Sequence, residues 1–293
     1  MAVLEGLQEA ARAAVAGVSP SVVRVGRGGG RGCGVVIGDG LVATNAHNLR
    51  GDEVHVTFAG GREALAAVAG VDADGDVAVL RVDTTGAPAV TWSDELPGPG
   101  DVVFAVMRTS GAGERVSFGM VSGTERAFRG PRGRRIKGSI EHTAPLPRGS
   151  SGSPLVTGSG AVVGLNTNRL GDGFYLAIPA DRELRDRLAA LATGRSRSRR
   201  RLGVGLAPAK VARALRRSVG LDERDGLLVR VVEDGSPAAA AGIRQGDLIV
   251  TVGGQPVTTA DDLYDALDGE PAEVHLGIVR GSEEIALTVR FEG

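Results

Sequence analysis

The sequence predicts a mostly β protein with two domains, of which the second is smaller and mixes helices with strands. Short apolar runs such as SVVRV, EVHVTF and DVVFAV follow one another closely over the first two thirds of the chain, each bounded by Gly, Asp or Pro. This spacing is typical of β-sandwiches and β-barrels. The basic run GRSRSRRR at 194–201 interrupts the pattern, and strand-like runs are mixed with helix-like runs after it.

The first domain is expected to begin with a helix and to continue as strands. Apolar residues recur at helical spacing over residues 4–17, which predicts an amphipathic helix. The strand-like runs that follow are SVVRV, GVVIG, LVAT, EVHVTF, LAAVAGV, VAVLRV, DVVFAV, RVSFGMVSG, PLVTG and AVVGLNT. DRELRDRLAALATG at 181–194 has the pattern of a helix and closes a domain that we place at residues 1–193.

A linker and a second domain are expected after this helix. Residues 194–201 are polar and basic and show no hydrophobic period, so we expect a solvated linker. In residues 202–293 the runs LGVGL, GLLVRVV, DLIVTVGG, AEVHLGIVR and EIALTVRF are strand-like, whereas SPAAAAGI and ADDLYDALDG are helix-like. This mixture predicts a small α+β domain.

Composition limits the classes of function. The chain has 293 residues, a formal net charge of −1 and 3% aromatic residues. This balance argues against nucleic-acid binding. The alternative, an adaptor that binds nucleic acid or anionic lipid, depends on the basic linker alone. The sole cysteine, Cys33, allows neither an intramolecular disulfide nor a cysteine-based metal cluster, and we expect a small buried side chain. GRGGGRG at 26–32 lacks the Gly-Lys-Ser/Thr ending of a phosphate-binding loop. We therefore expect no metal, no nucleotide and no other cofactor.

The N-terminus carries no targeting signal of a recognisable kind. Glu5 and Glu9 stand where a signal peptide carries positive charge, and no apolar run approaches the length of a membrane span. The chain as it stands is predicted to be cytoplasmic, or extracytoplasmic if a leader has been removed.

The stretch RGSSGSPLV at 148–156 has two interpretations. It is an ordinary turn, or it holds a serine that attacks carbonyl groups. A serine hydroxyl is a poor nucleophile unless a base, usually His, takes its proton and a carboxylate orients that base. The search therefore turns to histidines and carboxylates at strand ends of the same β domain.

His47 is the best placed of the four histidines to be a base. His55 and His275 alternate within strand-like runs and are typical strand-face residues, and His142 precedes the serine turn. His47 ends GLVATNAH, where a strand stops and small polar residues begin, and Asp76 opens the run GDVAVLRV. The chain order His, Asp, Ser is one of the known orders of a catalytic triad. Taken singly, each residue also has a structural interpretation as a turn or strand-end residue.

These segments together resemble the HtrA (Deg) branch of the trypsin-like serine proteases. The matching segments are VSPSVVRV at 18–25, GCGVVIGDGLVATNAHNL at 32–49, DADGDVAVLRVD at 72–83, VSFGMVSGTER at 116–126, IEHTAPLPRGSSGSPLV at 140–156, and AVVGLNTN with the later GFYLAIP. The resemblance covers nearly the whole chain in the family's order. It implies a trypsin-like double β-barrel protease domain at 1–193.

The resemblance assigns roles to the residues of the triad. His47 would be the general base, Asp76 would orient it, and Ser151 would be the nucleophile. The backbone N–H groups of Gly149 and Ser151 would form the oxyanion hole. The residues agree with this choice of serine, because Gly149 and Gly152 flank Ser151 and small residues let the backbone turn tightly.

The same resemblance implies a pocket for the side chain that precedes the scissile bond. In trypsin-like folds the residues before the nucleophile form its base, which here are Pro145 and Leu146, with further contacts from Leu165 and the loop at 166–170. Neither Pro145 nor Leu146 is acidic, so a basic substrate side chain would find no partner there. We expect small or medium apolar side chains such as Val, Ala or Leu.

Residues 202–293 resemble the PDZ domain that follows the protease in this family, above all in EDGSPAAAAGIRQGDLIVTVGGQPV. Such domains bind an extended peptide as an added strand and hold its terminal carboxylate with backbone N–H groups. The resemblance implies that Leu202, Gly203 and Val204 supply that backbone, and that Leu263, Ala266 and Leu267 line the groove wall. Plain core packing is the alternative for each of these residues.

The resemblance implies an ATP-independent serine endopeptidase that cleaves unfolded or misfolded polypeptides, with peptide C-termini bound at the PDZ groove. The family also suggests a homotrimer built through the N-terminal region. The alternative is a peptide-binding scaffold or holdase with little proteolytic activity. An intact set of His47, Asp76 and Ser151 argues against the scaffold, which has no need of all three.

Overall fold

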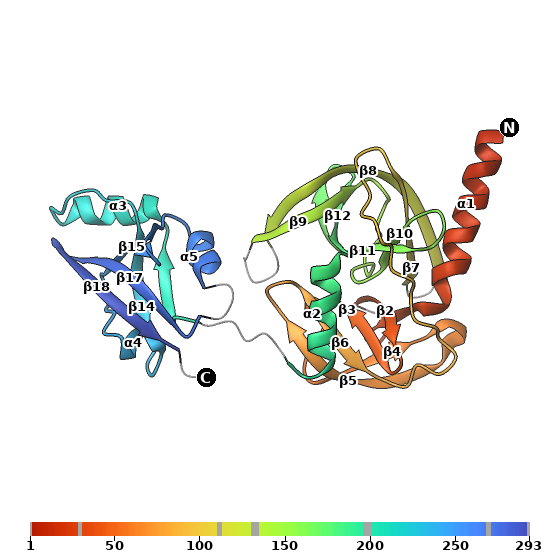
Figure 1. Ribbon diagram of the computed structural model, residues 1–293, viewed down its shortest axis with the longest axis horizontal. Helices are drawn as coiled ribbons and strands as arrows, with labels where there is room; N and C mark the ends of the chain where they lie inside the picture. The colour runs from red at the N-terminus through yellow and green to blue at the C-terminus, as the bar shows by residue number, and fades with distance from the viewer. Residues whose placement is uncertain are drawn as a thin grey trace. The chain divides into compact units, whose positions relative to one another are not determined.

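The computed structural model describes residues 2–28, 31–109, 113–129, 135–195, 201–267 and 271–291. The chain divides into two compact units, Met1–Arg197 and Ser198–Gly293 (Figure 1). The division falls inside the predicted linker, of which residues 196–200 lie outside the described part, as do Gly29 and Gly30 of the glycine-rich run. None of the described helices is long and apolar enough to cross a membrane.

The described strands of the first unit form two closed β-barrels. Around barrel 1 the order is β1 (Val22–Val25), β2 (Gly32–Gly38), β3 (Leu41–Thr44), β6 (Val77–Arg81), β5 (Glu63–Asp72) and β4 (Glu53–Thr57). Around barrel 2 it is β10 (Pro154–Val156), β11 (Val162–Gly171), β12 (Phe174–Pro179), β9 (Arg135–His142), β8 (Gly113–Arg129) and β7 (Val102–Thr109). This is the double barrel that the sequence resemblance implies.

The first unit begins and ends with a helix, and each of these two helices packs against one barrel. Helix α1 (Ala2–Val18) packs against β7 of barrel 2, and helix α2 (Arg182–Ala192) packs against β5 and β6 of barrel 1 (Figure 1). Asp181 caps α2 by accepting a hydrogen bond from the Leu184 N–H at 2.8 Å. Because α2 covers the outer side of β6, four successive residues of that strand, Val77 to Leu80, are fully buried. An open strand face would show the alternation of buried and exposed residues.

The second unit is a mixed sheet with three helices among the described residues. The strands lie in the order β13 (Val204–Ala207), β14 (Leu227–Val232), β15 (Leu248–Val252), β17 (Glu273–Arg280) and β18 (Glu283–Arg290), with β16 (Gln255–Pro256) paired to β15. The helices are α3 (Ala209–Ser218), α4 (Pro237–Ala240) and α5 (Ala260–Ala266). The sequence analysis did not predict α3. Its inner face carries Ala212 and Arg216 while Val211 and Leu215 are exposed, so its hydrophobic pattern does not mark its buried side.

The contact between α2 and barrel 1 gives a test of this packing. A Cβ at Gly70 in β5 would lie 2.5 Å from the Leu191 carbonyl oxygen, which is backbone and cannot rotate away. We expect Gly70→Ala to lower the free energy of unfolding by about 2 kcal/mol. The measurement is urea unfolding followed by the fluorescence of Trp92, the single tryptophan, which lies in the first unit.

The matched control is Gly6→Ala in α1, where an added Cβ meets nothing within 4 Å. Alanine favours helix over glycine, so this variant should unfold at the same or a higher urea concentration. Equal stability of the two variants would contradict the close approach of α2 to β5.

Candidate active site

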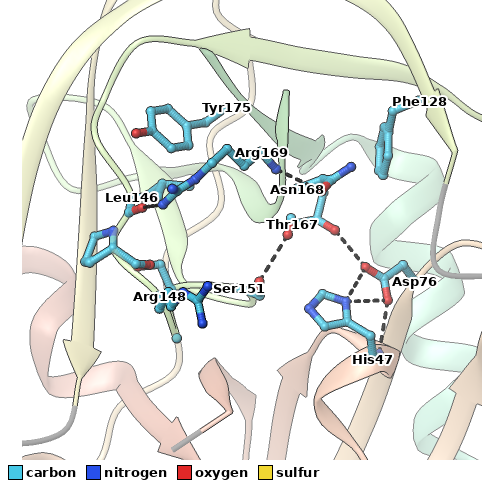
Figure 2. Close-up of a pocket in the computed structure, with 13 residues that line it drawn as sticks. His47, Asp76, Phe128, Leu146, Arg148, Ser151, Thr167, Asn168, Arg169 and Tyr175 are labelled. Atoms are coloured by element: carbon cyan, nitrogen blue, oxygen red, sulfur yellow. Dashed lines mark hydrogen bonds and ion pairs between the residues drawn. The ribbon is translucent and has the colours of Figure 1, made fainter. Parts of the chain in front are cut away.

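One cavity of about 680 Å³ in the first unit collects most of the residues that the sequence analysis selected (Figure 2). His47, Asp76, Gly149 and Ser151 all line it. His47 lies in a short 3-10 turn after β3, and Asp76 directly precedes β6, so both come from barrel 1. Ser151 lies in the turn before β10 of barrel 2. The two barrels thus each supply part of the cavity.

The imidazole of His47 and the carboxylate of Asp76 are directly hydrogen-bonded. His47 Nδ1 lies 2.8 Å from Asp76 Oδ2 and 3.0 Å from Oδ1, and the His47 main-chain N–H donates to Oδ1 at 3.1 Å. The Asp76 side chain is buried, whereas that of His47 is 30% exposed. An ionised carboxylate only accepts hydrogen bonds, so Nδ1 carries a proton, and in the neutral imidazole Nε2 then has the free lone pair. That tautomer is the one a general base requires.

Asp76 is held in a backbone conformation that is unusual for a residue with a side chain. Its φ is 55°, in the left-handed region. Its carbonyl accepts hydrogen bonds from Asn45 Nδ2 at 2.9 Å and from the Ala46 N–H at 3.2 Å. Its carboxylate also accepts one from Thr167 Oγ1 at 2.7 Å. These bonds fix the direction of the carboxylate towards His47.

In Figure 2 the Ser151 side chain lies beside His47, but its dashed line runs to Thr167 and not to the imidazole. Ser151 Oγ donates to the carbonyl oxygen of Thr167 at 3.1 Å rather than to the imidazole. The Thr167 hydroxyl and carbonyl therefore contact Asp76 and Ser151 respectively.

The other two serines of the turn are occupied elsewhere. Ser150 Oγ donates to the Pro147 carbonyl at 2.7 Å, and Ser153 Oγ accepts from Asn166 Nδ2 at 3.0 Å. Both side chains are buried. Ser150 and Ser151 both line the cavity, but Ser150 and Ser153 are buried whereas Ser151 is partly exposed.

Barrel 1 clamps the backbone of this turn. The Ser151 carbonyl accepts from the Cys33 N–H at 2.7 Å and from Asn48 Nδ2 at 3.0 Å. Gly149 has φ 84° and Gly152 has φ 86°, and a Cβ at Gly152 would lie 2.1 Å from the Cys33 carbonyl oxygen. Within the described residues, the N–H groups of Gly149 and Ser151 donate to no other group. Both donors are therefore available to an anionic oxygen.

Cys33 is a structural residue of this clamp. Burial raises the pKa of its thiol to about 11, and its Sγ lies 3.4 Å from the Gly149 carbonyl oxygen. A thiol with this pKa stays protonated and unreactive near neutral pH. Among the described residues, no group of three or more His, Cys, Asp or Glu side chains is arranged to hold a metal ion.

The predicted pocket residues do not all reach the cavity. Leu146 lines it, and Pro145 lines a neighbouring hollow that shares Leu146. Leu165 lines neither; it is fully buried in the apolar core of barrel 2. The expectation that Leu165 contacts the substrate is not met, because β11 stays covered until Thr167 and only its end reaches the cavity.

The end of β11 instead brings polar side chains to the cavity. Asn168 and Arg169 line it, together with Arg148, Phe128 and Tyr175 (Figure 2). An Nη2 atom of Arg169 donates to the Leu146 carbonyl oxygen, and its guanidinium carbon lies 5.4 Å from the centroid of the Tyr175 ring. The wall of the pocket is thus not purely apolar.

Known proteins resemble both units. A trypsin-like peptidase domain matches residues 32–165, and a PDZ domain matches residues 228–280. The chain is 35% identical, over 88% of its length, to a probable periplasmic DegP-like serine endoprotease of Halomonas elongata, of which it spans 55%. It is 32% identical, over 89% of its length, to the putative serine protease HhoA of Synechocystis sp., of which it spans 70%. The chain belongs to the HtrA family of serine proteases.

A solved structure of the HtrA family shares the fold of both units. The HtrA-type protease AlgW, determined with a tripeptide, superposes with a TM-score of 0.68 at 28% identity, covering 95% of each chain. The trypsin-like double barrel and the PDZ domain predicted from the sequence are confirmed.

The PDZ unit of this HtrA chain brings its predicted groove residues together. Leu202, Leu263 and Leu267 are buried in one apolar cluster, and Val204 and Ala266 pack against it. Gly203 has φ 76°, and a Cβ there would lie 2.3 Å from Ser236 Cβ. Strand β13 pairs only with β14 among the described strands, so its other edge is unpaired. The three leucines act as core residues, and β13 is an edge strand that can accept another strand.

His142 stands behind the serine turn of this HtrA protease domain. It is fully buried, its Nε2 lies 2.9 Å from Asn166 Oδ1, and it stacks on Tyr175. Asn166 in turn accepts the Gly152 N–H at 2.7 Å and donates to Ser153 Oγ. Burial lowers the pKa of His142 to about 4, and the hydrogen bond to Asn166 offsets only part of this effect.

This pKa makes the stability of the protease unit depend on pH. Between the ordinary value of about 6.5 and the folded value of about 4, the unfolded chain binds a proton at His142 that the folded chain excludes. The neutral His142 side chain contributes about 3 kcal/mol to the free energy of unfolding. This contribution is fully present above pH 6.5 and is lost as pH falls to 4.

We expect Trp92-monitored urea unfolding of the wild type to show this loss, and His142→Gln to show a smaller one. His55→Gln, which removes another histidine of the same unit, is the control and should keep the wild-type pH dependence. If the free energy of unfolding of His142→Gln falls with pH as steeply as that of the wild type, His142 accepts a proton as readily in the folded state as in the unfolded state.

Proposed function

We propose that the protein is a serine endopeptidase that cleaves unfolded or exposed polypeptide by acyl transfer. His47 is the general base, Asp76 orients it, and Ser151 is the nucleophile. The observation that carries this proposal is the hydrogen-bonded pair of His47 and Asp76, which lines the same cavity as the partly exposed Ser151.

The chemistry follows from the hydrogen-bonding roles. When Ser151 Oγ turns from the Thr167 carbonyl to His47 Nε2, the imidazole takes its proton as Oγ attacks the substrate carbonyl carbon. The imidazolium that forms is stabilised by the buried Asp76 carboxylate. His47 then gives the proton to the leaving amine, and a water molecule activated in the same way hydrolyses the acyl-enzyme.

The oxyanion forms at the substrate carbonyl oxygen. Its proposed donors are the N–H groups of Gly149 and Ser151, whose lack of another partner among the described residues supports this role. The Ser150 carbonyl accepts the Ser153 N–H at 2.9 Å, and this bond fixes the peptide plane that carries the Ser151 N–H before the charge develops. Such preorganised donors each contribute roughly two to three decades in turnover.

The PDZ unit is proposed to bind peptide C-termini at the unpaired edge of β13. The peptide would add as a strand, and the backbone from Leu202 to Val204 would receive its carboxylate. Two bonds support this placement: the Leu202 carbonyl accepts the Ala238 N–H at 2.9 Å, and the Gly203 carbonyl accepts the Glu233 N–H at 2.8 Å. In a trans peptide the N–H points opposite to the carbonyl, so these bonds direct the Gly203 and Val204 N–H groups away from the body of the unit.

The nucleophile is tested by substitution. We expect Ser151→Ala to lower the turnover of casein by about four decades, because no other group replaces the attacking oxygen. A fluorophosphonate probe should label the wild type and not this variant. Ser150→Ala is the matched control and should keep both activity and labelling, since its hydroxyl bonds the Pro147 carbonyl. A wild type that binds peptides but takes no label would favour the scaffold alternative.

Coupling between the units is tested with peptides. We expect peptides with a free apolar C-terminus to activate cleavage in the full chain. No hydrogen bond among the described residues holds the Arg148 carbonyl, so this peptide is able to rotate and withdraw the Gly149 N–H from the oxyanion. A coupling of about 1–3 kcal/mol corresponds to roughly 5- to 150-fold.

The comparison is with residues 1–195 alone and with the same peptides amidated at the C-terminus, neither of which should show activation. If residues 1–195 are already as active as the peptide-saturated full chain, the PDZ domain only tethers substrates.

A further inference from the structure

The substrate cavity carries more positive charge than its apolar sequence pattern suggests. Arg148 and Arg169 line the cavity, and Arg115 lines the neighbouring hollow, which shares Leu146, Pro147 and Tyr175 with it. Arg148 and Arg115 form no ion pair within the described part of the chain. The whole chain has a net charge of −1, so this concentration of arginine is local.

No carboxylate in these two hollows neutralises the arginines. Among the residues that line them, Asp76 is the one acidic side chain, and it is already hydrogen-bonded to His47 and to Thr167. An anionic substrate group that enters would therefore meet unpaired guanidinium groups rather than competing carboxylates.

Arg169 is the best positioned of the three. It extends from the end of β11 across the cavity towards Leu146, with Tyr175 beside it (Figure 2). A guanidinium has five N–H donors in a planar fork, and the contact with the Leu146 carbonyl leaves most of them unused. The group is thus held in place and still able to form the paired hydrogen bonds that suit a carboxylate.

The place of Arg169 relative to the nucleophile identifies the substrate residue that it contacts. Ser151 Oγ bonds Thr167, two residues before Arg169, and the pocket lies between this end of β11 and the residues that precede Ser151. The trypsin-like fold implies that the side chain next to the attacked carbonyl enters between these two segments.

We propose that Arg169 makes this a pocket for an acidic side chain, Glu or Asp, at the residue whose carbonyl is attacked. Leu146 and Tyr175 contact its aliphatic part, and the guanidinium binds its carboxylate. This inference rests on the proposed peptidase function, and it replaces the apolar preference expected from the sequence.

The test uses amide-capped peptides that are identical except at the residue before the cut, which is Glu, Gln, Leu or Lys. The full-length wild type should cleave the Glu peptide with a kcat/KM about tenfold above that of the isosteric Gln peptide, with Lys the poorest. Arg169→Leu should lose this preference and favour Leu, Arg169→Lys should keep part of it, and added salt should reduce it. Arg182→Gln, which removes an arginine that is 92% exposed on α2, should leave it unchanged.

A second readout separates this inference from the activity on which it rests. The full-length Ser151→Ala variant should bind the same peptides uncleaved, Glu about tenfold more tightly than Gln, and Arg169→Leu in that background should abolish the difference. Equal affinities, or a Glu preference that survives Arg169→Leu, overturn the inference even if Ser151 takes the fluorophosphonate label. An unlabelled wild type whose Ser151→Ala variant still prefers Glu overturns the proposed function and keeps the acidic pocket.

Discussion

Thr167 is the residue on which the arrangement of the site depends, because it connects groups that come from different barrels. Its hydroxyl donates to the Asp76 carboxylate of barrel 1, and its carbonyl accepts from Ser151 of barrel 2. In the opposite direction, Cys33 of barrel 1 holds the Ser151 carbonyl. A movement of one barrel relative to the other would break these bonds. Such a movement is unfavourable, because it would leave the Asp76 carboxylate buried with fewer hydrogen bonds. The relative position of base and nucleophile is thereby a property of the barrel interface rather than of either barrel.

The serine turn is held by hydrogen bonds from two parts of the protease unit. Barrel 1 holds its front through the Ser151 carbonyl, and Asn166 of β11 holds its back through the Gly152 N–H and the Ser153 hydroxyl. His142 completes the back as a buried neutral side chain against Asn166. Because Nε2 faces the Asn166 amide oxygen, a protonated imidazole would carry its second N–H on Nδ1, which is buried without a hydrogen-bond partner among the described residues. The same acidification that lowers the stability of the unit therefore acts directly behind the nucleophile.

The sequence predicts many of the barrel strands because they are short apolar runs with turn residues at their ends, although β9, with the sequence RIKGSIEH, is not such a run. Chain order makes His47, Asp76 and Ser151 candidates, and the resemblance to the HtrA family assigns their roles. The sequence does not reveal Thr167, whose role depends on a contact with Asp76, 91 positions away in the chain. The resemblance places Leu165 among the pocket residues, but β11 stays covered as far as Thr167 and Leu165 is buried. The sequence pattern also misses α3, whose buried face includes Arg216, bonded to main-chain carbonyls, rather than an apolar stripe. The failures share one cause: each depends on a tertiary contact that overrides local pattern.

The proposed role of Arg169 also depends on tertiary contacts that the sequence does not reveal. By sequence it is one arginine in a polar loop, and exposed ion pairs contribute little when both partners must be ordered from solution. In the structure its guanidinium is ordered in advance by the Leu146 carbonyl and the Tyr175 ring. Preorganisation removes part of the entropic cost that an incoming carboxylate would otherwise meet. The selectivity then lies in the contacts that hold Arg169 as much as in its charge, and loss of the Tyr175 ring would weaken it while leaving the charge in place.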